Sequence, residues 1–333
     1  MRRRFRKFYT KHSHVRRQLP ASISLPVDAR YLVAYVCMVL FFLLIIPFVS
    51  IQLFPRLIED VPETSPGITL PETVSVYITS EEKTKTIPFE NYITGVVASE
   101  MPDSFELEAL KAQAVASRTY ALGRIKSGTQ LCDTVHCQVY RDHDIPAKVR
   151  RAVKATAGQV LTYNSKLASQ ALYFSSSAGD TENAEDVFAN PYPYLVSVSS
   201  NYEPGATHKK EKKTMTLKEF RHTIKEAFPD TDFGKIKTSN IKISGRTKGG
   251  RVSEVQVGDA VLSGGDLRTA FGLYSTRFVI TTRGSKVTIT SAGSGHGVGM
   301  SQYGANGLAK QGRSYKQILK HYYKGVDVTV GSK

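Results

Sequence analysis

The chain has 333 residues, enough for one large domain or two smaller ones with a hydrophobic core. Its net charge of +16 would suit nucleic-acid binding, but residues 1–20 alone hold eight Arg or Lys and no acid. The rest keeps 45 − 8 = 37 basic against 29 acidic residues, a net +8. Half of the excess thus belongs to a short tail, which argues against a nucleic-acid partner. Three cysteines exclude a disulfide scaffold.

Residues 31–54 form an uncharged stretch of 24 positions in which only Ser50 and Gln52 are clearly polar. A helix of that length crosses a hydrocarbon core of roughly 30 Å, and the basic flank places the N-terminus in the cytoplasm. A cleaved signal peptide is the alternative, although no small-residue cleavage site stands out. We predict a cytoplasmic basic tail at 1–30, a single-pass transmembrane helix at 31–54, and an extracytoplasmic remainder held at the cell membrane.

The remainder begins with a linker and continues as one mixed domain. Residues 55–72 are rich in proline and acid and predict a tether, so the extracytoplasmic domain occupies 73–333. Its strands and helices do not alternate regularly, which favours the α+β class. Strands are expected at 74–78 and 83–87 (a hairpin), 159–163, 171–175, 194–199, 240–244, 252–257, 277–282 and 286–290. Helices are expected at about 89–99, 104–126, 216–228 with Thr216 as N-cap, and 314–323, with an exposed loop at 201–213.

One carboxylate stands in an unusual position at the end of the first of these helices. Glu100 closes the run "TGVVASEMP" and precedes Met101-Pro102, which ends the helix because a residue before proline is disfavoured in helical conformation. The carbonyl groups at a helix C-terminus disfavour an anion. A carboxyl group there, in a partly apolar site, should have its neutral form favoured.

The helix at 104–126 is apolar on two faces and is expected to lie between layers, with Asp103 and Glu106 at capping-box spacing. Arg118 falls inside one apolar stripe, where a guanidinium needs a carboxylate, carbonyl groups or a ligand. It is either a structural ion pair or a substrate contact. At about 1.5 Å per residue it lies roughly 20 Å from the helix start, which argues against direct pairing with Glu100.

The segment "LCDTVHCQVY" (131–140) packs Cys132, His136 and Cys137 into six residues. Thiolate and imidazole groups are zinc ligands, but the spacing departs from the usual Cys-x₂-Cys pair and leaves the fourth ligand open. A Cys132–Cys137 disulfide or free thiols compete with zinc outside the membrane. A structural zinc ion is thus one alternative, and no other cofactor is expected.

The segment "YFSSSAGDTENAEDVF" (173–188) is a candidate for substrate binding. Tyr173 is suited to stack on a sugar ring, and Ser175 and Ser177 are suited to bond sugar hydroxyls. A serine hydrolase would carry a Gly-x-Ser-x-Gly elbow, and none is present. A plain strand and loop is the alternative interpretation.

The glycine-rich segment "GSGHGVGMSQYGANGLA" (293–309) lacks the Lys-Ser/Thr of a P-loop and the spacing of a dinucleotide fingerprint. Alternate glycines indicate backbone that another chain or a ligand approaches closely. His296, Ser301, Gln302 and Tyr303 supply donors, acceptors and a phenol, a mixture that suits hydroxyl-rich ligands such as sugars. A tightly packed turn before a helix is the alternative.

Several of these blocks, in order, resemble the stage II sporulation protein D family, which also includes modifiers of cell-wall amidases. They are "YITGVVASEMPDSFELEALKAQAVASRTYA", "YFSSSAGDTENAEDVF", "PYLVSVSS" and "GHGVGMSQYGANGLA". The similarity covers roughly residues 70 to 330. It implies a peptidoglycan lytic transglycosylase that acts on glycan strands stripped of stem peptides during engulfment of the forespore, beside a membrane-bound amidase-endopeptidase at the sporulation septum.

The resemblance also implies roles for individual residues. Glu100 matches the catalytic glutamate, Arg118 matches a functionally important position, and some relatives bind zinc at a segment similar to that of Cys132. A protonated acid is what glycosidic cleavage needs, because the leaving oxygen must receive a proton. Sugar hydrolases use two carboxylates, whereas one suffices when the 6-hydroxyl of muramic acid attacks C1 and leaves a 1,6-anhydro end.

Two other functions compete with the enzyme. The amidase-modifier branch makes a non-catalytic glycan-binding activator of an amidase credible. A septal scaffold that recruits its partner is a third reading, compatible with the first. The lone carboxylate of Glu100 without a basic neighbour is better explained by acid catalysis, so the enzyme is the favoured prediction.

Overall fold

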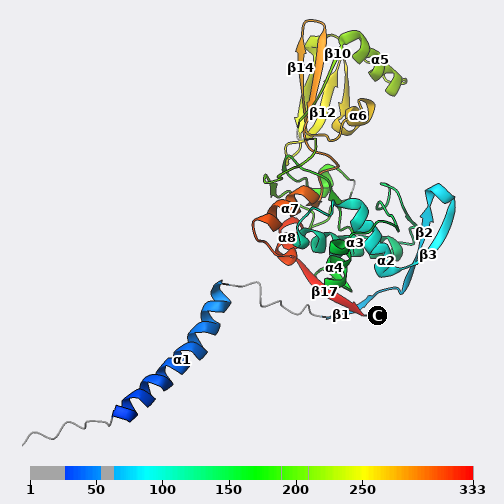
Figure 1. The fold of residues 1–333 in the computed structure, drawn as a ribbon. Helices are drawn as coiled ribbons and strands as arrows, with labels where there is room; N and C mark the ends of the chain where they lie inside the picture. The colour runs from blue at the N-terminus through cyan, green and yellow to red at the C-terminus, as the bar shows by residue number, and fades with distance from the viewer. Residues whose placement is uncertain (1–26, 54–63, 189, 209, 333) are drawn as a thin grey trace, which may run out of the picture. The chain divides into compact units, whose positions relative to one another are not determined.

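The computed structural model describes residues 27–53, 64–188, 190–208 and 210–332 (Figure 1). The chain divides into two compact units, Met1–Asp60 and Val61–Lys333, and each is considered by itself. In the first, α1 (Val27–Leu53) is helical over most of the predicted span 31–54. Among the residues described, no helix is both long and apolar enough to cross a membrane. The membrane span therefore stays a prediction, and residues 1–26 of the predicted tail lie outside the described residues.

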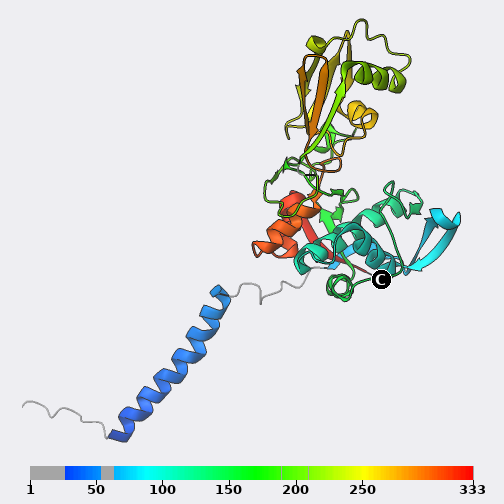
Figure 2. The same ribbon diagram turned by 45° about the horizontal axis from the view of Figure 1, so that its top comes forward.

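The second unit is a mixed α+β structure, as predicted, with two hydrophobic cores. The first core surrounds α3 (Leu107–Lys126), which is buried along most of its length and packs against four other helices and strand β5 (Figures 1 and 2). The helices are α2 (Phe89–Glu100), α4 (Ala147–Ala155), α7 (Gln302–Lys310) and α8 (Tyr315–Tyr322), and the strand is β5 (Gln159–Tyr163). A helix apolar on two faces is thus buried between layers, as its sequence predicts.

Small sheets complete this core. One has the order β1-β17-β5-β6 and another β3-β2-β4, and two short ladders pair β16 with β7 and β8 with β9. Their bounds are β1 (Thr64–Thr69), β2 (Thr73–Ile78), β3 (Lys83–Pro88), β4 (Leu131–Cys132), β6 (Lys166–Leu167), β7 (Tyr173–Phe174), β8 (Gly179–Asp180), β9 (Ser199–Ser200), β16 (Met300–Ser301) and β17 (Val326–Ser332). The predicted hairpin at 74–78 and 83–87 is confirmed as antiparallel β2 and β3.

Five sequence expectations are corrected here. The tether predicted at 55–72 ends earlier, because β1 pairs parallel with β17 and buries Ile68; residues 54–63 lie outside the described residues. The helix expected from 104 begins at Leu107 without a side-chain cap, because Phe105 closes a turn on the carbonyl of Pro102. The strands expected at 171–175 and 194–199 shrink to the two-residue β7 and to β9, whereas the loop expected at 201–213 ends where β10 begins.

The segment Glu211–Ser291 has a core of its own and is called the inserted module below. It holds two three-stranded antiparallel sheets, β10-β15-β14 and β11-β12-β13, with two helices. Their bounds are β10 (Glu211–Thr216), α5 (Leu217–Ala227), β11 (Ile241–Arg246), β12 (Val252–Val257), β13 (Ala260–Ser263), α6 (Gly264–Ala270), β14 (Phe278–Arg283) and β15 (Lys286–Ser291). Thr216 caps α5 in a capping box, as predicted.

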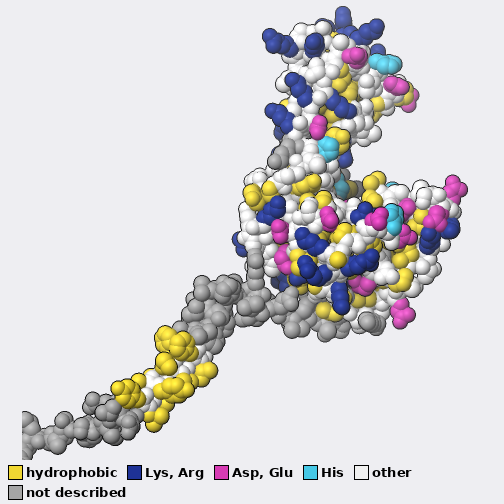
Figure 3. All heavy atoms as spheres, viewed as in Figure 1, with side chains coloured by type: hydrophobic (Ala, Val, Ile, Leu, Met, Phe, Trp, Pro, Cys, Tyr) yellow, Lys and Arg dark blue, Asp and Glu magenta, His cyan; other side chains and the backbone are white. Residues whose placement is uncertain are grey.

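Residues 209–291 carry 17 Lys and Arg against 8 Asp and Glu. In Figure 3 the dark blue side chains accordingly outnumber the magenta ones over the inserted module. The remaining residues from 64 onward carry 18 basic and 17 acidic residues. The positive excess of this part of the chain therefore lies almost entirely in residues 209–291, which are the inserted module and the two lysines that precede it.

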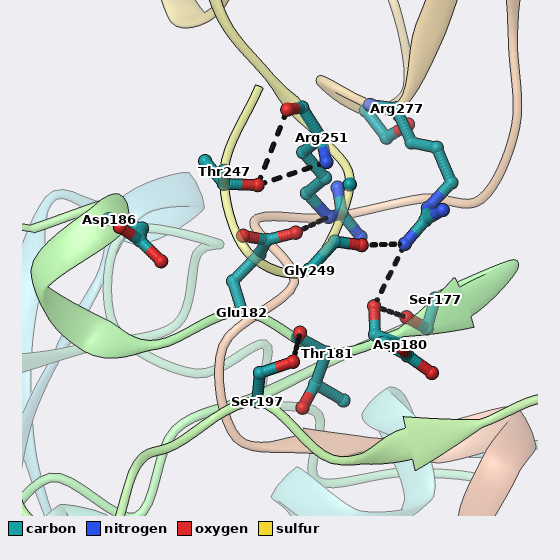
Figure 4. Close-up of polar contacts among 12 residues, drawn as sticks. Ser177, Asp180, Thr181, Glu182, Asp186, Ser197, Thr247, Gly249, Arg251 and Arg277 are labelled. Carbon is teal, nitrogen blue, oxygen red and sulfur yellow. Dashed lines mark hydrogen bonds and ion pairs between the residues drawn. The ribbon is translucent and has the colours of Figure 1, made fainter. Parts of the chain in front are cut away.

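Buried charges join the inserted module to the first core (Figure 4). Arg251 is 1% exposed, lies 3.6 Å from the carboxylate of Glu182, which is fully buried, and donates from Nη1 to the carbonyl of Gly295 at 3.1 Å. Arg277 donates to the carbonyl groups of Asp180 and Gly249. Moving the module away would leave the buried charges of Arg251 and Glu182 without partners, which is costly. These contacts therefore hold the inserted module against the glycine-rich segment.

Candidate active site

The acid of the site is set by the end of α2. Glu100 is the last helical residue, and Met101 is extended (φ −125°, ψ 139°) while its N–H still bonds the carbonyl of Val97 at 3.1 Å. The helix ends where Pro102 requires it, as the sequence predicts. The backbone thus turns away at this point and leaves the half-buried side chain of Glu100 at the edge of the first core.

Two hydrogen bonds hold the carboxyl group of Glu100. The N–H of Val139 donates to Oε1 at 2.9 Å, and Nε2 of Gln302 donates to Oε2 at 3.1 Å. Burial is the largest influence and raises the pKa of Glu100, while the two hydrogen bonds lower it and only partly offset the burial. The shift is towards the neutral acid relative to a free carboxyl group, in the direction expected from the sequence, and burial is its largest cause.

The first of these donors belongs to a loop that is packed firmly onto α2. The amide of Gln138 accepts from the Tyr92 hydroxyl at 3.3 Å and donates to the carbonyl of Ser117 at 3.2 Å. The ring of Tyr140 stacks on Tyr92 with centroids 5.4 Å apart. A Cβ at Gly95 would lie 2.2 Å from the carbonyl oxygen of Arg141, so only glycine allows this approach.

The second donor is positioned by the glycine-rich segment. Gly293, Gly295, Gly297 and Gly299 all have positive φ, and a Cβ at Gly299 would lie 2.0 Å from the carbonyl oxygen of Leu172. This tight path sets β16 beside β7, and Ser301 then caps α7 by accepting from the N–H of Gly304 at 3.1 Å. The close approach predicted for the glycines is confirmed, since the backbone carbonyl of Leu172 lies against Gly299 and that of Ser176 lies against Gly293. The glycines therefore form a packed turn before α7, while Gln302 and Tyr303, which follow them, remain candidates for substrate binding.

A pocket of about 590 Å³ opens over Glu100. It is lined by Ala98, Ser99, Glu100, Met101, Pro102, Asp103, Phe105, Arg141, Asp144, Pro146, Ser175, Thr207, Gln302 and Tyr303. Four of the predicted site residues are thus brought together, namely Glu100, Ser175, Gln302 and Tyr303. The ring of Tyr303 packs edge-on against Phe105 with centroids 5.0 Å apart.

The sequence did not single out Asp103, Asp144 and Arg141 for this pocket. The carboxylate of Glu100 is consequently not alone, which corrects one premise of the sequence argument. In the sequence, Asp103 follows Pro102, and Arg141 and Asp144 follow the cysteine segment 131–140. These positions along the chain do not predict that the three side chains line one pocket.

Four other predicted residues do not line this pocket and have partners within the fold. The Tyr173 phenol is buried near Glu100, and burial and then the charge of Glu100 raise its pKa. Ser177 donates to the carbonyl of Asp180 at 2.7 Å, and Ser301 donates to Glu203. His296 bonds the Tyr173 carbonyl at 3.1 Å and the Val298 N–H at 3.1 Å, and burial lowers its pKa to about 4.

Arg118 is fully buried and serves the scaffold. Its Nε and Nη2 donate to the two carboxylate oxygens of Glu90 at 2.8 and 2.7 Å, and Nη1 donates to the carbonyl of Gln159 at 2.9 Å. It does not line the pocket. Of the two roles left open by the sequence, this placement favours the structural one, and the assignment of Arg118 as a substrate contact is corrected.

The cysteine cluster lies just before the loop that holds Glu100. Cys132 and Cys137 are joined as a disulfide, and Nδ1 of His136 lies 3.9 Å from Sγ of Cys137. One ligand atom from each of the three residues lies within 4.8 Å of the others, so the donor set also suits a zinc ion once the thiols are reduced. The disulfide and the zinc site exclude each other because both use the same sulfur atoms.

Comparisons with known proteins place the chain beside sporulation proteins and an amidase enhancer. Residues 77–163 match the family model described as stage II sporulation protein. The chain is 36% identical over 317 residues to stage II sporulation protein D of Bacillus subtilis (strain 168), covering 86% of this chain and 90% of that protein. It is 38% identical over 279 residues to the protein of that name from Bacillus amyloliquefaciens, covering 78% and 79%. It is also 34% identical over 285 residues to the amidase enhancer of Bacillus subtilis (strain 168), covering 71% of this chain and 40% of that protein.

Proposed function

This chain belongs to the stage II sporulation protein D family, and we propose that it is a lytic transglycosylase that cleaves peptide-free glycan strands of peptidoglycan. The observation that carries the proposal is the half-buried carboxyl group of Glu100, which lines a pocket with several polar groups and whose pKa is raised by burial. An alkoxide leaving group needs a proton donor, and a raised pKa makes a carboxyl group a better candidate for that role.

The proposed reaction uses one side chain twice. Glu100 donates its proton to the bridging oxygen as the bond between that oxygen and C1 of muramic acid breaks. The 6-hydroxyl of the same sugar then attacks C1, and Glu100 takes the hydroxyl proton. The proton removed in the second step replaces the one given in the first, so the acid is regenerated and the product carries a 1,6-anhydro end. Gln302 orients the carboxyl group throughout, since its amide donates to Oε2 at 3.1 Å.

Asp103 and Asp144 in the same pocket make hydrolysis the alternative chemistry, because an inverting or retaining glycosidase needs a second carboxylate. Mass spectrometry of the products separates the two. We expect 1,6-anhydro ends from the wild-type chain and from Asp144→Asn, and no product from Glu100→Gln. Reducing ends, together with loss of activity in Asp144→Asn, would support the hydrolase.

A non-catalytic role has separate support. One relative is named amidase enhancer, which favours a chain that binds glycan and activates or recruits a cell-wall amidase-endopeptidase. Turnover by the purified chain in the absence of any amidase distinguishes the functions. If an amidase is stimulated equally by the wild-type chain and by Glu100→Gln, and neither cleaves glycan alone, the activator is the better description.

We further propose that residues 31–54 anchor the chain in the membrane, with the folded part outside at the sporulation septum. Support comes from the uncharged 24-residue sequence and its basic flank. Membrane fractionation followed by protease treatment of intact cells tests this proposal. Recovery of the chain in the soluble fraction would contradict it.

The cysteine cluster is proposed to stiffen the loop that carries Val139, either as the disulfide or as a structural zinc site. Cys132, His136 and Cys137 would hold the ion, which would supply a cross-link and no catalytic chemistry. Metal analysis and the mass of the unreduced chain together identify the form. In both forms the consequence is the same, because the loop delivers an N–H to Glu100.

A further inference from the structure

The pocket holds one cation whose function the fold does not explain. Nε of Arg141 is buried and has no hydrogen-bond partner, and no ion pair of this side chain is found within the part of the chain that the structure describes. Asp103 and Asp144 also line the pocket, and among the described residues neither forms an ion pair with Arg141. Arg141 as a whole is half-buried, but its buried Nε–H without a partner is costly unless a ligand accepts from it.

The backbone around Arg141 is fixed more firmly than a surface loop would be. Its carbonyl oxygen lies against Gly95 of α2, the preceding ring of Tyr140 stacks on Tyr92, and Val139 bonds Glu100. Val139, whose N–H bonds Glu100, and Arg141, whose Nε is unpaired among the described residues, therefore lie two residues apart in one firmly packed segment. A ligand that forms hydrogen bonds with Arg141 is therefore held at a fixed position relative to the carboxyl group of Glu100.

Arg141 is not expected to take part in cleavage of the glycosidic bond itself. Positive charge develops at C1 as the glycosidic bond opens, and a nearby cation would oppose it. Arg141 is also absent from the groups that shift the pKa of Glu100, which are burial, Val139 and Gln302. Its role is then to bind a part of the substrate that stays unchanged.

We propose that Arg141 binds the free lactyl carboxylate of a muramic acid residue and so selects glycan without stem peptides. A planar guanidinium matches a carboxylate with two parallel hydrogen bonds. Where a stem peptide is attached, that carboxylate is an uncharged amide, and the pair cannot form. This inference rests on the proposed function, because it names what the same pocket recognises.

The test uses two substrates made from one glycan preparation, the peptide-free strand and the same strand with its carboxylates converted to primary amides. For the wild-type chain we expect KM to be lower for the free carboxylate by about tenfold or more, the effect of a hydrogen bond to a charged group. Arg141→Gln should remove most of that preference by raising KM for the free carboxylate, with kcat changed far less. Arg141→Lys should keep part of it.

Arg150→Gln serves as the matched control, because it removes an exposed cation of α4 outside the pocket and should keep the preference. The proposal is overturned if the wild-type chain does not discriminate between the two strands, or if Arg141→Gln weakens both equally. If the wild-type chain cleaves neither strand, the proposed enzyme fails, but equilibrium binding still decides the role of Arg141. A Glu100→Gln chain should then bind the free strand more tightly than the amidated one only while Arg141 is present.

Discussion

The ion pair between Glu90 and Arg118 gives a prediction that separates scaffold from substrate contact. Glu90→Ala removes a bidentate partner at 2.8 and 2.7 Å from a guanidinium that is fully buried in α3. Two carbonyl oxygens remain for Nη1, those of Gln159 at 2.9 Å and Ala114 at 3.4 Å. Breaking a buried pair costs 3–5 kcal/mol, and because the Glu90 side chain is partly exposed and those carbonyls stay, we expect about 3 kcal/mol.

Thermal and urea unfolding measure this change. For a folded part of this size, about 3 kcal/mol lowers Tm by roughly 6–12 °C. Glu81→Ala, which removes an exposed carboxylate paired with Lys83 and Lys85, is the matched control and should change Tm little. At a temperature where the Glu90→Ala chain is folded, glycan cleavage should stay near the wild-type rate. A chain that keeps its Tm and loses its activity would refute the structural role of Arg118.

Three further outcomes are expected. Because burial raises the pKa of Glu100, the protonated acid is lost only as pH rises through that raised value, so kcat should fall on the alkaline side; a pH–rate profile of the wild-type chain checks this, and a kcat that stays constant on the alkaline side would contradict it. His296 is held neutral with its pKa lowered from 6.5 to about 4, so the unfolded chain binds more protons in that window and stability should fall as pH drops from about 6.5 to 4; urea unfolding of His296→Gln should show a weaker pH dependence there. Cys137→Ser removes the cross-link in either of its forms and should reduce the rate of glycan cleavage while changing Tm little, because the loop it stiffens carries Val139. Cleavage assays and thermal unfolding measure the two effects. An unchanged cleavage rate would show that the Val139 loop does not need the cross-link.

Local signals predicted the parts of the fold that depend on neighbours in sequence. The hairpin of β2 and β3, the cap of α5, and the end of α2 before Pro102 all follow from residues within one turn or one strand pair. The placement of Glu100 at a helix end was predicted correctly for the same reason. Its hydrogen-bond partner Gln302 lies 202 residues away, and nothing local indicates that contact.

Long-range packing decided what the sequence did not predict. The glycine-rich segment indicated close approach, but whether a ligand or the chain's own Leu172 approaches depends on the pairing of β16 with β7. The hydroxyls of Ser177 and Ser301 look free in the sequence, and in the fold Asp180 and Glu203 accept from them. Arg141 and Asp144 entered the pocket through a loop whose sequence drew attention only to its cysteines.

The most direct test of the central claim is cleavage of peptide-free glycan in water enriched in oxygen-18. If Glu100 drives attack by the sugar's own 6-hydroxyl, no solvent oxygen enters the new end, and a Glu100→Gln chain releases no product. Oxygen-18 at C1 of the released end would show that water is the nucleophile and would contradict the account, as would undiminished cleavage by Glu100→Gln.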